Sequence, residues 1–80
     1  MKERKIKLST ITEAKAFVTE AMKCNFDVDV YYNRIVIDAK SILGVLSLDL
    51  TKDLHVRIHG ENAEFEKYLD TVAAANEQIA

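Results

Sequence analysis

Residues 26–38 read FDVDVYYNRIVID, and this stretch decides the fold. Every second residue from position 26 to position 32 is apolar or aromatic, and the residues between them are two aspartates and a tyrosine. This two-residue period predicts a strand with one buried face. Asn33-Arg34 predicts a tight turn, and residues 35–37, all aliphatic, predict the returning strand of a hairpin.

Two other segments show the same alternation. Residues 54–58 read LHVRI, with the apolar residues at the odd positions of the segment. Ile6 and Leu8 alternate with Lys5 and Lys7 and predict a strand near the amino terminus. Because each strand has one apolar and one polar face, we expect an antiparallel sheet with one face in contact with solvent.

Helical patterns occupy the intervals between the strands. Thr10 with Glu13 three residues later matches a capping box, and Asn25 is expected to end this first helix in the left-handed conformation. A short apolar helix is expected over residues 41–48, and a last helix after Asn62. The buried stripes are expected to contain, in the first helix, Ala14, Phe17, Val18, Ala21 and Met22, and in the last, Phe65, Tyr68, Leu69, Val72, Ala75 and Ile79.

The order of the expected elements is βαββαβα. It predicts an α+β fold, an open-faced two-layer sandwich with a four-stranded antiparallel sheet and three helices on one face. The core is expected to contain Ile6, Leu8, Phe17, Val28, Val30, Val56, Ile58, Leu69 and Val72.

Composition excludes several classes of function. Eighty residues suffice for one domain spanning 1–80. Eleven Lys and Arg against 13 Asp and Glu give a net charge of −2, which disfavours direct nucleic-acid binding. One Cys and two His predict neither a disulfide framework nor a metal site, and no cofactor motif is present. No apolar run approaches a membrane span and the start lacks a signal peptide, so we expect a cytoplasmic protein without membrane contact.

The segment 38–50, DAKSILGVLSLDL, carries the functional information. It closely resembles the regulatory-serine segment of HPr, the histidine-containing phosphocarrier of the bacterial sugar phosphotransferase system. The chain length and the βαββαβα order agree with that family. The resemblance implies that an ATP-dependent HPr kinase/phosphorylase modifies Ser41, and that the modified form binds a regulatory partner such as a LacI-type repressor of catabolite repression.

The surroundings of Ser41 favour both a phosphorylation site and a simpler role. Backbone N–H groups at a helix start attract phosphate, and Lys40 adds a nearby cation. Ile42, Leu43 and Leu46 cannot all point inward from one short helix, so some should form an exposed docking patch. The alternative is that Ser41 is only a helix cap and the aliphatic residues are only core.

The family's other motif is missing. Phosphocarrier HPr uses a Gly-x-His-x-Arg-Pro-Ala-like loop, which would align with residues 8–14, LSTITEA. Ser9, Thr10 and Thr12 stand there, and a Thr hydroxyl without an adjacent base is too weak a nucleophile to replace imidazole. The resemblance is therefore to non-enzymatic regulatory paralogues that keep the serine and lack the histidine. An atypical phosphocarrier and a plain protein-interaction domain remain as alternatives.

The remaining reactive side chains are expected to be structural. His55 and His59 lie on the outward face of the predicted strand, where Asp27 and Asp29 could face them. Cys24 is expected to be a small buried apolar residue.

Overall fold

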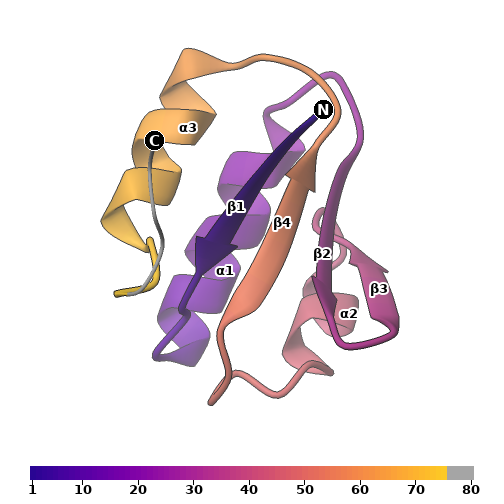
Figure 1. Ribbon diagram of the computed structural model, residues 1–80, viewed down its shortest axis with the longest axis vertical. Helices are drawn as coiled ribbons and strands as arrows, with labels where there is room; N and C mark the ends of the chain where they lie inside the picture. The colour runs from indigo at the N-terminus through magenta and orange to yellow at the C-terminus, as the bar shows by residue number, and fades with distance from the viewer. Residues whose placement is uncertain (76–80) are drawn as a thin grey trace.

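The computed structural model describes residues 1–75, in which seven elements follow the predicted order. They are β1 (Lys2–Ile6), α1 (Ile11–Met22), β2 (Val28–Tyr32), β3 (Ile35–Asp38), α2 (Ile42–Leu46), β4 (Leu54–Ile58) and α3 (Ala63–Thr71). The helices cover one face of the sheet, and the other face is open (Figure 1). The predicted α+β sandwich is confirmed.

The strands form one antiparallel sheet in the order β1-β4-β2-β3. Val30 of β2 lies opposite Val56 of β4, which lies opposite Arg4 of β1. The register places the apolar positions of β2 and β4 against the helices, while Asp29, Tyr31 and the other alternate residues lie on the open face. All nine residues predicted for the core are buried.

The first strand begins and ends earlier than predicted. It covers Lys2–Ile6, and Leu8 is buried beyond its end. After Ile6 the backbone leaves β4 and bonds with the segment that follows α3: the Lys7 N–H donates to the Val72 carbonyl (2.8 Å) and the Ala74 N–H to the Lys5 carbonyl (2.9 Å). These tertiary bonds, which a local pattern does not contain, set the end of the strand.

Three details of the helices differ from the predictions. Asn25 does not end α1 in a left-handed conformation, because Lys23 caps it with right-handed geometry. Among residues 1–75 the left-handed conformation occurs at Asn33 (φ 55°), in the hairpin turn. Met22 is 63% exposed because it lies at the rim of the helix layer. Ala75 is exposed because α3 already ends at Thr71, and the predicted burial of Ile79 falls outside the described residues.

Candidate functional site

Ser41 caps the short helix α2, as predicted. Its hydroxyl oxygen Oγ accepts a hydrogen bond from the Gly44 N–H (3.1 Å). The turn before it is held by Asp38, whose carbonyl accepts from the Ser41 N–H (3.0 Å) and whose Oδ1 accepts from the Lys40 N–H (2.9 Å). Ser41 is therefore fixed on the backbone while its side chain remains partly exposed.

The aliphatic residues after Ser41 divide between core and surface. Val45 is fully buried and anchors α2, whereas Leu43 is 81% exposed. Ile42 and Leu46 are half-buried at the rim of the core. We call Ile42, Leu43 and Leu46 the α2 patch. Their predicted exposure is confirmed, while their role in binding a partner stays a prediction.

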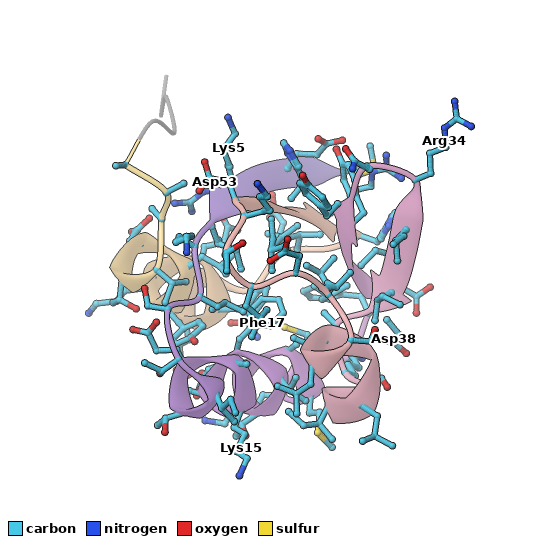
Figure 2. The ribbon with its side chains drawn as sticks, turned by 90° about the horizontal axis from the view of Figure 1, so that it is seen from below. Lys5, Lys15, Phe17, Arg34, Asp38 and Asp53 are labelled. Carbon is cyan, nitrogen blue, oxygen red and sulfur yellow. The ribbon has the colours of Figure 1, made fainter. Side chains whose placement is uncertain are left out.

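A shallow groove joins the α2 patch to α1. It is lined from α1 and from the start of α2 by Lys15, Val18, Thr19, Met22, Lys40 and Ile42. Lys15 points away from the body of the molecule on the outer side of α1 (Figure 2). The groove beside the α2 patch is therefore lined by the aliphatic side chains of Val18, Met22 and Ile42 and by two lysines, Lys15 and Lys40.

The Lys40 ammonium does not lie free beside Ser41. Its Nζ donates to the backbone carbonyl of Cys24 (2.9 Å), at the carboxyl end of α1. A cation there complements the negative end of the helix dipole. The sequence predicted that Lys40 supplies a nearby cation for a phosphate on Ser41. In the structure the ammonium is already bonded to a carbonyl 16 residues away, so a phosphate would compete with this bond.

The backbone N–H groups at the start of α1 already have hydrogen-bond acceptors from nearby side chains. Ser9, Thr10 and Thr12 are exposed at this end of the helix. Thr10 Oγ1 accepts from the Glu13 N–H (3.1 Å), and Glu13 Oε1 accepts from the Ser9 N–H (2.6 Å). The capping box is confirmed with one difference: the Glu13 carboxylate bonds to the amide before the cap residue rather than to the cap residue's own amide.

Both histidines lie on or beside β4, in contacts with the open face of the sheet. The His55 ring stacks on Tyr31 with ring centroids 4.9 Å apart. His59 Nε2 lies 3.0 Å from Asp29 Oδ2, so the suggested Asp29 contact is confirmed. Each ring thus has a structural partner on this face.

Tyr31 is the centre of a cluster on the open face that the sequence patterns did not single out. The Arg57 guanidinium lies 4.3 Å from the centre of the Tyr31 ring. The Tyr31 hydroxyl donates to Glu3 Oε1 (3.1 Å). Arg57 also forms an ion pair with Glu3 (3.4 Å). The signal that could have revealed the cluster is the register, since Tyr31 lies directly opposite His55.

Cys24 is buried at the end of α1, as predicted. Burial raises the pKa of its thiol, and the nearby Lys40 ammonium opposes this only in part. A thiol with a raised pKa is a poor nucleophile at neutral pH, so this residue behaves as an apolar core side chain.

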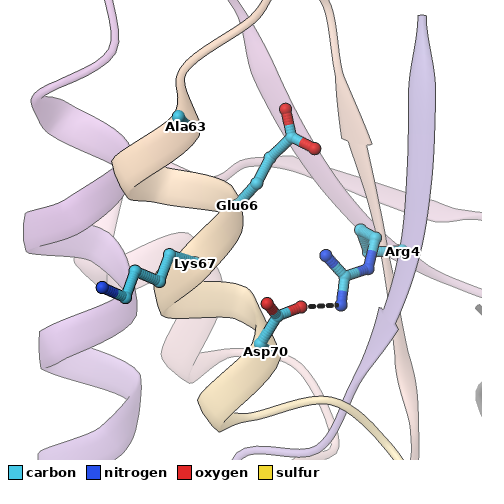
Figure 3. Close-up of a pocket in the computed structure, with 5 residues that line it drawn as sticks. All are labelled: Arg4, Ala63, Glu66, Lys67 and Asp70. Atoms are coloured by element: carbon cyan, nitrogen blue, oxygen red, sulfur yellow. Dashed lines mark hydrogen bonds and ion pairs between the residues drawn. The ribbon is translucent and has the colours of Figure 1, made fainter.

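A second hollow lies between β1 and α3. Figure 3 shows the residues that line it, Arg4, Ala63, Glu66, Lys67 and Asp70. Arg4 donates to Asp70 Oδ1 (2.8 Å), and Lys2 just outside the hollow donates to Glu66 (2.9 Å). We call this region the β1–α3 seam. Two ion pairs cross the seam, Arg4 with Asp70 and Lys2 with Glu66, which is the arrangement of a helix held to a sheet edge rather than of a ligand site.

The described residues contain no cluster suited to a metal ion. Between positions 1 and 75 no three His, Cys, Asp or Glu side chains come together in a way that could hold one. In the same range, no helix has the length and apolar character needed to cross a membrane.

Comparison with known proteins connects this geometry with one family. The family model described as the PTS HPr component phosphorylation site matches residues 11–78. The crystal structure of HPr-C-His from Thermoanaerobacter tengcongensis superposes with a TM-score of 0.74 at 26% identity, covering 89% of each chain. The phosphocarrier protein HPr from Bacillus anthracis has the same fold, with a TM-score of 0.68 at 23% identity over 89% of this chain and 95% of its own. No curated protein matches the sequence.

Proposed function

The chain belongs to the HPr family of the sugar phosphotransferase system, and on this premise we propose that it is a regulatory member, modified on Ser41 and unable to carry phosphate on a histidine. Proteins of this family are phosphocarriers and not enzymes. We propose further that residues 1–80 form one domain that acts in the cytoplasm. The observation that carries the loss of the carrier step is the Glu13 carboxylate, which occupies the start of α1 where a phosphate would bind.

The start of α1 is a poor place for a phosphoryl group in this chain. A phosphate at a helix start is held by backbone N–H groups. Here the Ser9 N–H is bonded to the Glu13 carboxylate and the Glu13 N–H to the Thr10 hydroxyl. A phosphate would have to displace both acceptors and approach a negative charge, which opposes its binding.

Neither histidine offers a substitute acceptor beside α1. His55 and His59 belong to the open face of the sheet, opposite the helix layer, through their contacts with Tyr31 and Asp29. The loop residues closest to the family's histidine and arginine positions are Thr10 and Thr12. The absence of imidazole from this loop supports a protein that does not pass on phosphate.

Ser41 is the better candidate for modification. Its hydroxyl oxygen accepts one hydrogen bond from Gly44, and its own proton is what a kinase base would remove as the γ-phosphoryl group passes from ATP. The Ile42 and Leu43 N–H groups lie in the first turn of α2, where no intrahelical carbonyl is available to them. A phosphate could accept from these amides, and the family resemblance makes an HPr-type kinase/phosphorylase the proposed donor system.

The α2 patch gives the modification a consequence. Leu43 is 81% exposed two residues from Ser41, so a partner docked on this patch would meet the new charge. A phosphate strengthens binding of a partner with arginines and weakens binding of an acidic one. We propose a regulatory protein, such as a LacI-type repressor, as the partner, with Lys40 contributing through its alkyl chain in the α1–α2 groove.

The test compares two phosphoryl donors on the same protein. Wild type, Ser41→Ala and Ser47→Ala are incubated with HPr kinase/phosphorylase and ATP, or with enzyme I and phosphoenolpyruvate, and analysed by intact mass. Ser47 is the matched control, because it is an exposed serine at the other end of α2. We expect one phosphate from the kinase on wild type and Ser47→Ala, none on Ser41→Ala, and none from enzyme I on any variant.

Other outcomes select the alternatives. Stoichiometric phosphate from enzyme I, on any residue, would establish an atypical phosphocarrier, and peptide mapping would identify the acceptor. No phosphate from either donor would reduce the proposal to a plain protein-interaction domain. Equal kinase labelling of Ser41→Ala and wild type would exclude Ser41 as the site.

A further inference from the structure

The outer edge of β3 is the feature that supports an inference beyond phosphorylation. β3 is the last strand of the order β1-β4-β2-β3, and within residues 1–75 it pairs only with β2. It forms one border of the molecule, with Arg34 projecting outward at one end and Asp38 at the other (Figure 2). An unpaired strand edge is a template for another strand, and proteins normally protect it.

The hydrogen-bond pattern shows which backbone groups point outward. The Ala39 N–H donates to the Val28 carbonyl (2.9 Å), so Ala39 and its alternate neighbour Ile37 turn their backbone groups toward β2. Because backbone direction alternates along a strand, Val36 and Asp38 turn theirs toward the open edge. The Asp38 carbonyl agrees with this, since it accepts from the Ser41 N–H rather than from β2.

The side chains along this edge are more apolar than an exposed edge requires. Ile35 and Val36 are each 54% exposed. The strand-pair register places Val36 on the open face beside Tyr31, and Ile35 on the helix side beside Tyr32. Both faces of the edge therefore present aliphatic surface that a neighbouring strand would cover.

The charges at the ends of the edge identify the occupant. Residues 34–38 read RIVID, with a cation at one end, an anion at the other and Val36 in the middle. In an antiparallel pair of two copies centred on Val36, Arg34 lies opposite Asp38 of the second copy, and Ile35 lies opposite Ile37. A two-fold axis repeats each contact, as a symmetric dimer interface requires.

We propose that this protein forms a two-fold dimer by antiparallel pairing of β3 with β3 of a second copy, which joins two sheets into one of eight strands. The outward-pointing backbone groups of β3 fit a pairing centred on Val36, because the N–H and carbonyl of each Val36 meet the carbonyl and N–H of the other Val36. Asp38 can take part while it holds the turn, since the bond to the Lys40 N–H uses only one of its two carboxylate oxygens. The proposal is independent of phosphorylation.

The same charges disfavour other registers. A slip of two residues in one direction places Arg34 opposite Val36 and gives Asp38 no cation. A slip in the other direction brings Arg34 toward Lys40, which carries the same charge. Complementarity at both ends occurs only for the pairing centred on Val36, and this favours a second copy over an unrelated extended segment.

The test is sedimentation equilibrium from about 10 µM to about 1 mM protein at low salt, a range suited to weak dimers. We expect the wild-type mass to rise from 9.1 kDa toward twice that value. Val36→Lys, which places two ammonium groups at the two-fold axis, should abolish the rise. Ile11→Lys is the matched control, because Ile11 is also an exposed aliphatic residue (60%) but lies on α1, and it should dimerise like wild type.

Charge reversal tests the register. Arg34→Asp and Asp38→Arg each place like charges opposite one another twice per dimer, so each should weaken dimerisation about tenfold. The double variant Arg34→Asp/Asp38→Arg restores opposite charges and should recover most of the loss. Far-UV circular dichroism checks that each variant is folded. If Asp38→Arg disturbs the turn that Asp38 holds, Val36→Lys still tests whether the dimer uses the β3 edge.

Three results would overturn the proposal. A wild type that stays monomeric to about 1 mM excludes self-pairing and leaves the edge for an extended segment of another protein. A dimer that survives Val36→Lys uses another surface. A double charge reversal that is no better than the single reversals excludes the register centred on Val36.

Discussion

Ser41 has a structural role as the cap of α2, and the proposed phosphorylation would have to leave this role intact. Its Oγ accepts from the Gly44 N–H at the start of α2, and a cap of this kind contributes about 1 kcal/mol to stability. We therefore expect Ser41→Ala to lower the free energy of unfolding by about 1 kcal/mol, whereas Ser41→Asp costs little because aspartate caps equally well. Urea unfolding of the three proteins measures both differences. A large loss in Ser41→Asp would mean that a negative charge is not tolerated here.

Tyr68 on α3 is a half-buried residue whose hydroxyl has no hydrogen-bond partner among residues 1–75. Its hydroxyl is buried and makes no hydrogen bond with any described residue. Removing an unsatisfied buried hydroxyl relieves its desolvation cost, so Tyr68→Phe should stabilise the protein by up to about 1 kcal/mol. Thermal unfolding at neutral pH checks the direction, and a clear destabilisation would mean that the hydroxyl has a partner after all.

Tyr68 also gives the protein a specific alkaline response. Burial first, then the Glu13 and Glu20 carboxylates, raises its pKa from 10.0 to about 12. The folded state keeps this proton where the unfolded state loses it, so stability is retained below pH 10 and falls as the pH rises from 10 toward 12. Part of that fall should be absent in Tyr68→Phe, and absorbance titration should show one of the three tyrosines ionising last.

At the scale of elements, α2 depends on a glycine for its close approach to β3. A Cβ at Gly44 would lie 2.5 Å from Ile37 Cγ2 and 3.1 Å from Ser41 Oγ. Gly44→Ala gains helix propensity of about 1 kcal/mol, but the overlap with a core-packed side chain costs more, and we expect a net loss of about 1–2 kcal/mol. Chemical denaturation gives the value.

Ile37→Ala provides the control for this contact, because it removes the clashing methyl group. In the Ile37→Ala background, Gly44→Ala should cost less than in wild type, and a double-mutant cycle measures the difference. Equal costs in the two backgrounds would mean that Ile37 does not limit the approach of α2.

Patterns that repeat along the chain predicted the elements well, and contacts between distant segments explain what they missed. Val28, Val30, Val56 and Ile58 are buried as the two-residue alternation predicted. The predicted end of β1 was wrong because hydrogen bonds to the segment after α3 determine it, such as the bond from Lys7 to Val72, 65 residues apart in sequence. A local pattern contains no information on such a pair.

The candidate site likewise has features that follow from local sequence and features that depend on distant contacts. The Ser41 cap and the exposed α2 patch follow from neighbouring residues, so the sequence predicted them. The bond from the Lys40 ammonium to the Cys24 carbonyl was not predicted, because its acceptor lies at the end of another helix. The same limit applies to the Tyr31 cluster, which forms only when β1, β2 and β4 lie side by side.

At the scale of the whole molecule, the two layers are joined by different forces at different places. Phe17 of α1 and Phe65 of α3 pack under the sheet with ring centroids 6.3 Å apart. At the border of the sheet, the β1–α3 seam relies instead on ion pairs, Arg4 with Asp70 and Lys2 with Glu66. Attachment of α3 should therefore depend on salt more than the core does.

The Arg4–Asp70 pair tests this view of the seam. The Arg4 side chain is only 14% exposed while that of Asp70 is 59% exposed, so solvent screens one end of the pair. A coupling of about 0.5–1 kcal/mol is expected at low salt for a pair of this kind. The cycle uses Arg4→Met, which keeps the packing of the alkyl chain, and Asp70→Asn, which keeps the shape of the carboxyl group, with urea unfolding of all four proteins. At about 1 M salt the Debye length falls to about 3 Å, and the coupling should shrink by half or more. A coupling that is unchanged by salt would mean that hydrogen-bond geometry, not charge, holds α3 against β1.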